Sequence, residues 1–175
     1  MIRLMMKKLK LLWLIPFLAL MVGALYLIPD RGQPFRVLVT RVIDGDTIVV
    51  QGDLRVRYIG VDTPEIENPS YGRRGEPLGQ EAKGLNQRLV TAKVITLEFD
   101  KERRDRYGRL LAYIWVNSTF VNAELVKAGL ARVIRRAPNL KYFSMLKALE
   151  QEARRNRLGI WGRDYSRRKP AHRPR

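Results

Sequence analysis

Carboxylate and guanidinium side chains recur in three short segments of this sequence. Residues 42–47 read VIDGDT, residues 57–65 read RYIGVDTPE, and residues 105–109 read DRYGR. Carboxylates at strand ends can hold a hard cation that prefers oxygen ligands, and a further carboxylate can orient or deprotonate water. An arginine offers a planar fork that matches a phosphate group. Together these groups meet the needs of phosphodiester hydrolysis, which are an activated water, neutralised phosphorus oxygens and a stabilised leaving group.

Each segment alone also has a purely structural explanation. Asp44-Gly45-Asp46 is typical of a turn, Thr63-Pro64-Glu65 suits the start of a turn or helix, and Tyr107-Gly108-Arg109 is compatible with a plain loop. For any one segment the structural reading is favoured. The three together favour chemistry, because they supply acids and arginines as one chemical set.

Other catalytic classes are excluded by composition. The chain has no cysteine and one histidine, His172, which lies in a Pro/Arg-rich tail. Thiolate sites and a cysteine nucleophile are therefore excluded, and a Ser-His-Asp triad or a histidine zinc site is close to impossible. Oxygen-only ligands favour calcium or magnesium over zinc or copper.

Net charge favours an anionic partner. The formal charge is +17, and the excess is spread over both ends and the middle of the chain. A basic fold attracts nucleic acid, anionic lipid or acidic polysaccharide. A basic proteome or simple solubility is the alternative explanation.

The N-terminus carries a membrane signal. Leu11 to Ile28 is a run of eighteen uncharged residues that follows several basic ones, and that length is just enough to cross a bilayer as a helix. The charge asymmetry predicts that the domain lies outside the cytoplasm. A cleaved signal peptide is the competing reading, with Val22-Gly23-Ala24 as a cleavage region, and a buried core helix is a third. We therefore expect residues 1–30 to be a membrane anchor, or a signal peptide of a secreted or periplasmic protein.

Hydrophobic periodicity and turn residues divide the remainder into short elements. The pattern predicts two strands within 35–50 (broken at Asp44-Gly45-Asp46), strands at 54–58, 94–99 and 110–116, and helices at 80–91, 120–128 and 140–158, with a further short strand at 130–134. Five short strands with a helix inserted between the third and fourth predict a mainly β (α+β) fold, a five-stranded OB-fold barrel with about three attached helices. We expect a linker at 31–34, this domain at 35–162 and a basic disordered tail at 163–175.

The ordered set of segments resembles the staphylococcal nuclease (thermonuclease) family. The resemblance spans about residues 36–162 and rests on Ile43–Thr47, Arg57–Glu65, Asp105–Tyr113, Val121–Ala131 and Asn156–Trp161. It implies the same helix-decorated OB barrel. It also implies an enzyme that cuts DNA and RNA with low base selectivity and leaves 3′-phosphate ends.

The resemblance implies a metal site and a general base. Asp46 and Asp62 would bind calcium, or another hard divalent cation, through their carboxylates, and Thr63 would add its backbone carbonyl. Glu65 would act as the general base on water near the metal. Asp44 would lie behind the ligands and hold the turn through hydrogen bonds.

The resemblance also implies residues that contact the substrate. Arg57 and Arg109 would contact the phosphate and stabilise the pentacovalent transition state. Tyr107 would lie near a terminal phosphate, with Arg106 beside it.

The chain departs from the family pattern after Leu130-Ala131. Arg135 and Ala137 occupy positions where the family's best-known member has tyrosines near the bound base. Arg135 would instead contact the nucleic-acid backbone or stack its guanidinium on a base. Arg73 and Arg74, in the loop 66–79, are further candidates for substrate contact, with a solvated loop as the alternative.

Two other functions compete with an active nuclease. One is a non-catalytic nucleic-acid-binding module on the same barrel, tethered to a membrane. The other is a membrane-surface protein whose basic tail binds anionic lipid. The presence of every expected carboxylate and arginine favours the enzyme, and nothing in the sequence demands more than a monomer.

Overall fold

The computed structural model describes residues 35–69, 72, 74–163 and 165 of the 175-residue chain. The chain divides into two compact units, Met1–Phe35 and Arg36–Arg175, and the elements below belong to the second, apart from the first residue of its first strand. Within the described ranges, no helix combines the length and apolar character needed to cross a membrane. The expected anchor or signal at Leu11–Ile28, the linker at 31–34 and most of the basic tail lie outside the described residues, so those expectations stay predictions.

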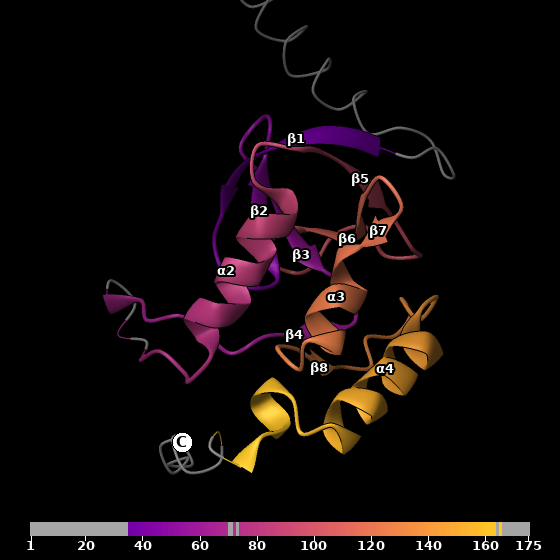
Figure 1. Ribbon diagram of the computed structural model, residues 1–175. Coiled ribbons are helices and arrows are strands. Elements are labelled where there is room, and N and C mark those ends of the chain that lie inside the picture. Colours follow the sequence, from indigo (N-terminus) through magenta and orange to yellow (C-terminus); the bar gives the residue numbers. More distant parts are fainter. Residues whose placement is uncertain (1–34, 70–71, 73, 164, 166–175) are drawn as a thin grey trace, which may run out of the picture. The chain divides into compact units, whose positions relative to one another are not determined.

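Five strands form a closed barrel, which confirms the prediction from the sequence pattern. They are β1 (Phe35–Val42), β2 (Thr47–Val50), β3 (Leu54–Tyr58), β5 (Val94–Glu98) and β6 (Leu110–Val116). Their order is β3-β2-β1-β5-β6, and a parallel pairing between β3 and β6 closes the sheet on itself. In that pairing Val56 lies opposite Leu110, and Tyr58 lies opposite Ala112. The barrel can be followed in Figure 1.

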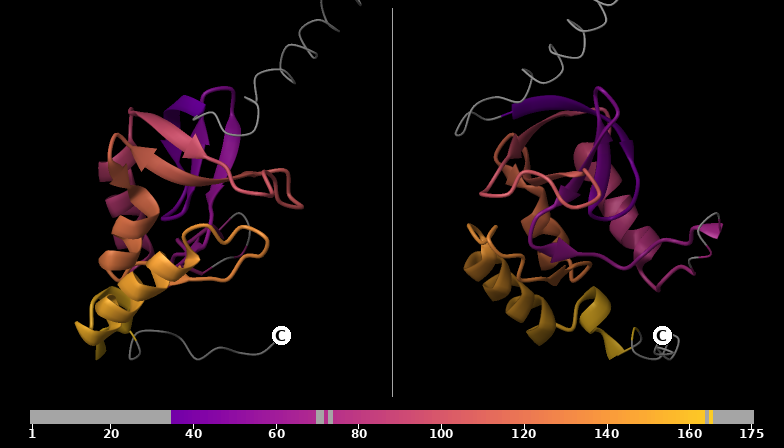
Figure 2. Two further views of the ribbon diagram at one scale, coloured as in Figure 1. Left: turned by 90° about the vertical axis from the view of Figure 1, so that its right-hand side faces the viewer. Right: turned by 180° about the vertical axis from the view of Figure 1, so that it is seen from behind.

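Short strands and helices complete the domain. The short strands are β7 (Thr119–Phe120), which pairs with β6, and β4 (Val61–Asp62), which pairs with β8 (Arg132–Val133). The helices are α2 (Gly79–Val90), α3 (Val121–Lys127) and α4 (Phe143–Arg155), followed by the short 3-10 helix η2 (Gly159–Trp161). Because α3 contacts β6, α2 and α4, it joins the barrel to the other two helices. Figure 2 shows this arrangement from two further sides.

The barrel interior is built from β-branched and aliphatic side chains. Along β1, the exposed residues Arg36 and Leu38 alternate with the buried residues Val37 and Val39, as expected for a half-buried strand. All four residues of β2 are buried, as are the first five of β6. Both faces of these two strands are covered, and this is why their sequences are nearly continuous apolar runs.

Helix α2 does not bury all of the apolar residues that recur along it at helical spacing. Ala82 and Val90 are buried, but Leu85 and Leu89 are only partly covered, and Asn86 is fully buried between them. The Asn86 side chain accepts a hydrogen bond from the Tyr58 hydroxyl (2.8 Å) and donates one to the Asp44 carbonyl (3.0 Å). A polar residue is stable there because the oxygen and the nitrogen of its side-chain amide are both hydrogen-bonded. The bond to Asp44 connects α2 to the turn that carries this residue.

Helix α4 is shorter at both ends than its sequence pattern predicts. It begins at Phe143 rather than Leu140 and ends at Arg155 rather than Leu158. The chain turns away at Arg157, whose φ of 54° is left-handed and cannot continue a right-handed helix. Tyr165, beyond the expected end of the domain, is buried.

Glu150 ties α4 to the strand pair that carries Asp62. Its side chain is buried and accepts a hydrogen bond from the Val133 backbone N–H (2.9 Å), with Lys147 and Arg154 as ion-pair partners. Val133 pairs with Val61, the residue before Asp62. The position of Asp62 therefore depends on a carboxylate on α4, seven elements later in the chain.

Asn122 at the start of α3 links one barrel strand to the segment that follows another. Its side chain is fully buried. It accepts a hydrogen bond from the Ile114 N–H (3.0 Å) and donates one to the Ile59 carbonyl (2.9 Å). It thus joins β6 to the segment that follows β3.

Replacing Asn122 with Ala is expected to lower the free energy of unfolding by about 3 kcal/mol, because a buried N–H and a buried C=O both lose their partner. Urea unfolding followed by tryptophan fluorescence measures this. Asn156→Ala is the matched control, since Asn156 is exposed, and it should change stability by less than about 0.5 kcal/mol. Equal stability of the two variants would contradict the assigned role.

Candidate active site

The turn between β1 and β2 presents Asp46 at one end of the barrel. Ile43 and Asp44 donate backbone hydrogen bonds to the Thr47 carbonyl (3.0 and 3.3 Å), and the Asp46 N–H donates to Asp44 Oδ1 (3.0 Å). Gly45 is required here because a Cβ at that position would lie 2.6 Å from Thr63 Oγ1. The turn is thus packed directly on the segment that follows β4.

The Asp46 carboxylate is almost wholly enclosed, with the residue 4% exposed. Its Oδ2 accepts hydrogen bonds from the Thr63 N–H (2.9 Å) and hydroxyl (3.2 Å), and its Oδ1 accepts one from the Thr47 hydroxyl (3.1 Å). These bonds fix the orientation of the carboxylate without neutralising its charge.

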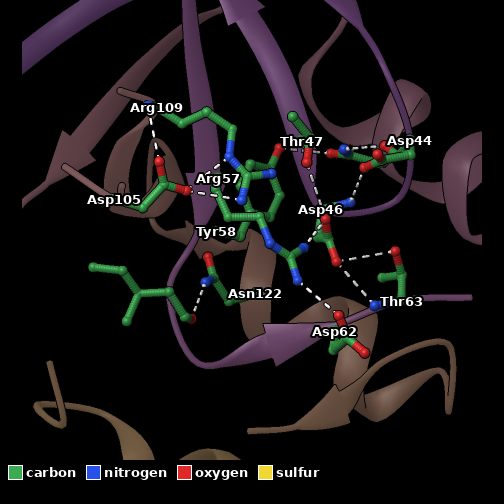
Figure 3. A network of polar contacts seen from close by, with 12 residues as sticks. Asp44, Asp46, Thr47, Arg57, Tyr58, Asp62, Thr63, Asp105, Arg109 and Asn122 are labelled. Carbon is green, nitrogen blue, oxygen red and sulfur yellow. Dashed lines mark hydrogen bonds and ion pairs between the residues drawn. The ribbon is translucent and has the colours of Figure 1, made fainter. Parts of the chain in front are cut away.

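Arg57, near the end of β3, joins Asp46 to Asp62. Its guanidinium forms an ion pair with Asp46 Oδ1 and a second with Asp62 Oδ1, where the N–O distance is 2.7 Å. Figure 3 shows the guanidinium between the two carboxylates. The Asp62 side chain is 52% exposed, so the pair opens to solvent on that side.

Burial and charge act against each other in this network. Burial lowers the pKa of the Arg57 guanidinium, while the charges of Asp62 and Asp44 raise it and the nearby Arg109 lowers it further. Burial also raises the pKa of Asp44, against the opposing effect of Arg57 and the hydrogen bonds with Thr47. The effect of Arg109 on the pKa of Arg57 indicates that the two guanidinium groups share one electrostatic environment.

Arg109 is held by Asp105. Both Nε and one terminal nitrogen of Arg109 lie 2.8 Å from Asp105 Oδ2, and Asp105 Oδ1 accepts hydrogen bonds from the backbone N–H of Tyr107 (2.9 Å) and of Arg109 (3.1 Å). Burial favours the neutral acid, but these hydrogen bonds outweigh it and lower the pKa of Asp105. The carboxylate therefore stays ionised and orients the arginine.

Arg106 and Tyr107 lie beside Arg109 on the loop between β5 and β6. Tyr107 is 68% exposed. Arg106 donates a hydrogen bond to its hydroxyl (2.6 Å), and the guanidinium carbons of Arg106 and Arg109 lie 4.8 and 5.6 Å from the centre of its ring. The loop projects from the barrel in the left view of Figure 2.

Glu65 lies two residues beyond Thr63 and its backbone is firmly placed. Its carbonyl accepts a hydrogen bond from the Glu76 N–H (2.8 Å). A Cβ on Gly79 would lie 2.4 Å from that carbonyl, so the start of α2 packs against the Glu65 backbone. The chain therefore carries Glu65 close to Thr63, whose N–H and hydroxyl bind Asp46.

The remaining predicted residues lie at the margin of this arrangement. Arg135 and Ala137 are exposed after β8, and Arg74 is exposed in the loop before α2. Arg73 lies outside the described residues. The structure thus brings together Asp44, Asp46, Arg57, Asp62, Thr63 and Arg109 (Figure 3), with Arg106 and Tyr107 next to Arg109.

Comparison with known proteins agrees with the geometry. Residues 55–163 match the family model described as staphylococcal nuclease homologue. This chain belongs to the staphylococcal nuclease family.

Relatives within the staphylococcal nuclease family align with most of the chain. A thermonuclease of Staphylococcus intermedius is 42% identical over 136 residues, which cover 76% of this chain and 79% of that protein. A thermonuclease of Staphylococcus hyicus is 41% identical over 132 residues, covering 74% and 76%. The endonuclease YncB of Bacillus subtilis (strain 168) is 45% identical over 132 residues, covering 73% and 62%.

The acidic residues of this staphylococcal nuclease family member form a sparse donor set. No cluster of three or more His, Cys, Asp or Glu side chains suited to a metal occurs among the residues that the structure describes. The predicted ligands are two carboxylates, Asp46 and Asp62, and one backbone carbonyl. The two carboxylates share a single guanidinium, so their oxygens already converge on one positive charge, and the set fits a hard cation.

Sequence reasoning missed the role of Asp105. It identified Asp105 only as part of a motif, whereas the structure shows it as the partner that orients Arg109. A carboxylate followed four residues later by an arginine, within a turn that contains glycine, was the available signal.

Proposed function

We propose that this protein is a calcium-dependent nuclease that hydrolyses phosphodiester bonds of DNA and RNA. The observation that carries the proposal is the placement of Arg57 between Asp46 and Asp62 within the electrostatic reach of Arg109. Carboxylates and two arginines at one end of an OB-like barrel suit an anionic ester. The relatives named thermonuclease and endonuclease support the same substrate class.

Asp46, Asp62 and the Thr63 carbonyl would hold the ion in this proposal, with calcium as the preferred cation and other hard divalent cations as substitutes. When bound, such an ion would polarise the scissile phosphate and lower the pKa of a nearby water. Asp46 is pre-oriented for this by Thr47 and Thr63. Asp44 supports the turn by accepting the Asp46 N–H.

Arg57 and Arg109 would stabilise the charge that develops on the phosphorus oxygens. Arg57 holds two carboxylates and would exchange one of these contacts for a phosphate oxygen. Arg109 keeps a terminal nitrogen for the substrate while Asp105 holds its other side. Fixed fork-shaped donors of this kind stabilise a transition state because they need not reorganise during the reaction.

Glu65 would act as general base on the attacking water. Contacts outside the reacting centre would not depend on the identity of the nucleobase. Tyr107 and Arg106 would contact a terminal phosphate, and Arg135 would contact the backbone or stack on a base. Low base selectivity follows, since these contacts read phosphate and ring faces rather than base edges. Cleavage would leave 3′-phosphate ends.

The test is cleavage of plasmid DNA and of RNA by the purified protein with calcium, followed by chelation. We expect cleavage with calcium, its loss when a chelator removes the metal, and its return when calcium is restored in excess. Gel retardation without cleavage under all conditions would select the non-catalytic binding module instead. Cleavage that persists in chelator would contradict the metal dependence.

Asp105→Asn is expected to lower kcat/KM about tenfold, because one charge-assisted contact to Arg109 is worth roughly 1.5 kcal/mol. A neutral amide at this site still fits but binds the guanidinium more weakly. Steady-state kinetics on a fluorogenic oligonucleotide measure the change. Asp53→Asn, in the exposed turn before β3, is the control. An equal effect in both variants would show that Asp105 does not position Arg109.

We further propose that the enzyme acts outside the cytoplasm as a monomer, either anchored by residues 1–30 or released after cleavage. The basic residues before the uncharged run Leu11–Ile28 support this orientation. Fractionation of cells with N-terminal sequencing of the recovered protein distinguishes the anchored form from the processed one. Recovery of the intact chain from the cytoplasmic fraction would contradict the proposal.

A further inference from the structure

A pocket that no catalytic step above uses lies where the start of α2 meets the segment after α4. Its volume is about 370 Å³, which is typical of sites for small ligands. Leu78 lines one wall, and Arg157, Gly159, Arg163 and Tyr165 line the other. Figure 1 shows the first turn of α2 and the chain beyond η2 at the same end of the domain.

The charged side chains that line this pocket are arginines. Arg157 and Arg163 both line it, and no carboxylate side chain is among its lining residues in the described part of the chain. Arg157 has a left-handed φ of 54°, a conformation that glycine or asparagine adopts with less strain. Backbone conformation alone would not favour an arginine there, so its charge needs a separate explanation.

Two more guanidinium groups lie on the aromatic side chains that follow α4, and one of them, Arg154, is also ion-paired with Glu150. Arg154 and Arg132 stack on the Trp161 ring, with their central carbons 3.8 and 5.3 Å from the ring centre. Arg132 also lies 5.9 Å from the ring centre of Tyr165. Arginines in the last turn of α4 complement the helix dipole, but that explains Arg154 rather than Arg163, which lies beyond η2.

One side of the pocket is the start of α2, where the Leu78 side chain provides no capping hydrogen bond and the Gly79 N–H donates to the Glu76 carbonyl (3.1 Å). A helix N-terminus carries partial positive charge that favours anions. Independently, Tyr165 is 6% exposed, and its buried hydroxyl has no hydrogen-bond partner among the residues that the structure describes, which is rare in folded proteins.

We infer that this pocket is a phosphate-binding subsite, which holds the backbone of the nucleic-acid substrate away from the linkage that is cut. The inference rests on the proposed function for the identity of the ligand. Leu78 precedes Gly79, which packs against the Glu65 carbonyl, so the pocket wall continues directly into the segment that carries the proposed general base. A polynucleotide chain that passes Glu65 can therefore reach the pocket, which favours a strand over free phosphate.

The first test compares two double variants with the same change of net charge. Arg157→Gly with Arg163→Gln alters the pocket, and glycine suits the left-handed backbone at 157. Arg88→Gln with Arg155→Gln removes two exposed arginines that do not line it. The affinity of a labelled single-stranded oligonucleotide is measured by fluorescence anisotropy with the 175-residue chains in detergent and chelator, over a series of salt concentrations.

We expect the pocket variant to bind about tenfold more weakly at low salt. Its plot of log K against log salt should become less steep by about 1.4, because each lost phosphate contact removes about 0.7 from the steepness for a single strand. The control pair should retain its slope. An equal change in both pairs would mean that net charge alone governs binding, and would overturn the inference. Unchanged binding in the pocket variant would also overturn it.

Tyr165→Phe separates a ligand contact from charge. Removing an unsatisfied buried hydroxyl should leave the melting temperature equal or higher, while oligonucleotide binding should weaken several-fold. A lower melting temperature with unaltered binding would show that the hydroxyl serves the fold and would count against the subsite.

Two further measurements identify the ligand. Inorganic phosphate is titrated as a competitor, and pocket-dependent binding of phosphate without any effect on the oligonucleotide would assign the site to free phosphate and overturn the inference. Cleavage of a dinucleotide, which spans only the reacting linkage, should be unchanged in the pocket variant, and a large loss there would place these arginines in the active site instead. Pocket-dependent binding by a protein that never cleaves would refute the proposed function and leave the subsite standing.

Discussion

Asp46→Asn is expected to lower kcat for DNA cleavage by about 10³-fold, which corresponds to roughly 4 kcal/mol of transition-state stabilisation. Asp46 is the most enclosed carboxylate of the proposed metal site, and four groups are directed at it, from Thr47, Arg57 and both donors of Thr63. An asparagine has the same shape, but it offers one oxygen instead of two and carries no charge. The ion would lose a ligand, and Arg57 would lose one of its two carboxylates.

The measurement is steady-state cleavage over a wide range of calcium concentration. Loss of a ligand should raise the calcium concentration needed for half-maximal rate, and saturating calcium should not restore the rate. Asp53→Asn, on the exposed turn between β2 and β3, should behave like the parent protein. Full activity of Asp46→Asn at ordinary calcium concentration would remove Asp46 from the metal site.

Glu65→Gln is expected to lower kcat by about 10²–10⁴-fold, the usual contribution of a positioned general base, while KM changes little. Glutamine keeps the shape and the backbone contacts with Glu76 and Gly79, but it cannot accept a proton from water. A loss that appears in kcat and not in KM indicates an interaction made only in the transition state.

The matched control for Glu65 is Glu67→Gln, on an exposed residue of the same segment. It should retain the kcat and the KM of the parent protein, because only Glu65 is the proposed base. Weaker substrate binding at constant kcat would show that Glu65 serves binding rather than proton transfer.

The barrel could be predicted because its strands are defined locally. β2, β3 and β6 are apolar or alternating runs bounded by turn residues, and their predicted limits agree with the structure to within a residue. The carboxylates could be located for the same reason, since Asp46 and Asp62 directly precede or end short strands. Local patterns are reliable where a turn and a strand are adjacent in sequence.

The features that sequence reasoning missed depend on partners distant in the chain. Asn86 and Asn122 look like surface polar residues of amphipathic helices, and their burial makes sense only once Asp44, Ile59 and Ile114 are beside them. The end of α4 at Arg155 was unpredictable because the helical pattern continues to Leu158, whereas the observed path is set by contact between Gly159 and Gly129. Tertiary contacts override local propensity at such places.

The parallel ladder between β3 and β6 has a consequence for how the enzyme can fail. Arg57 lies opposite Leu111, and Arg109 directly precedes β6, so the spacing of the two guanidinium groups is fixed by strand register rather than by a local turn. A slip of two residues would keep every side chain on its original face, yet would displace one arginine by roughly 7 Å along the strand. A variant that shifts this register can therefore retain its secondary structure while losing catalysis.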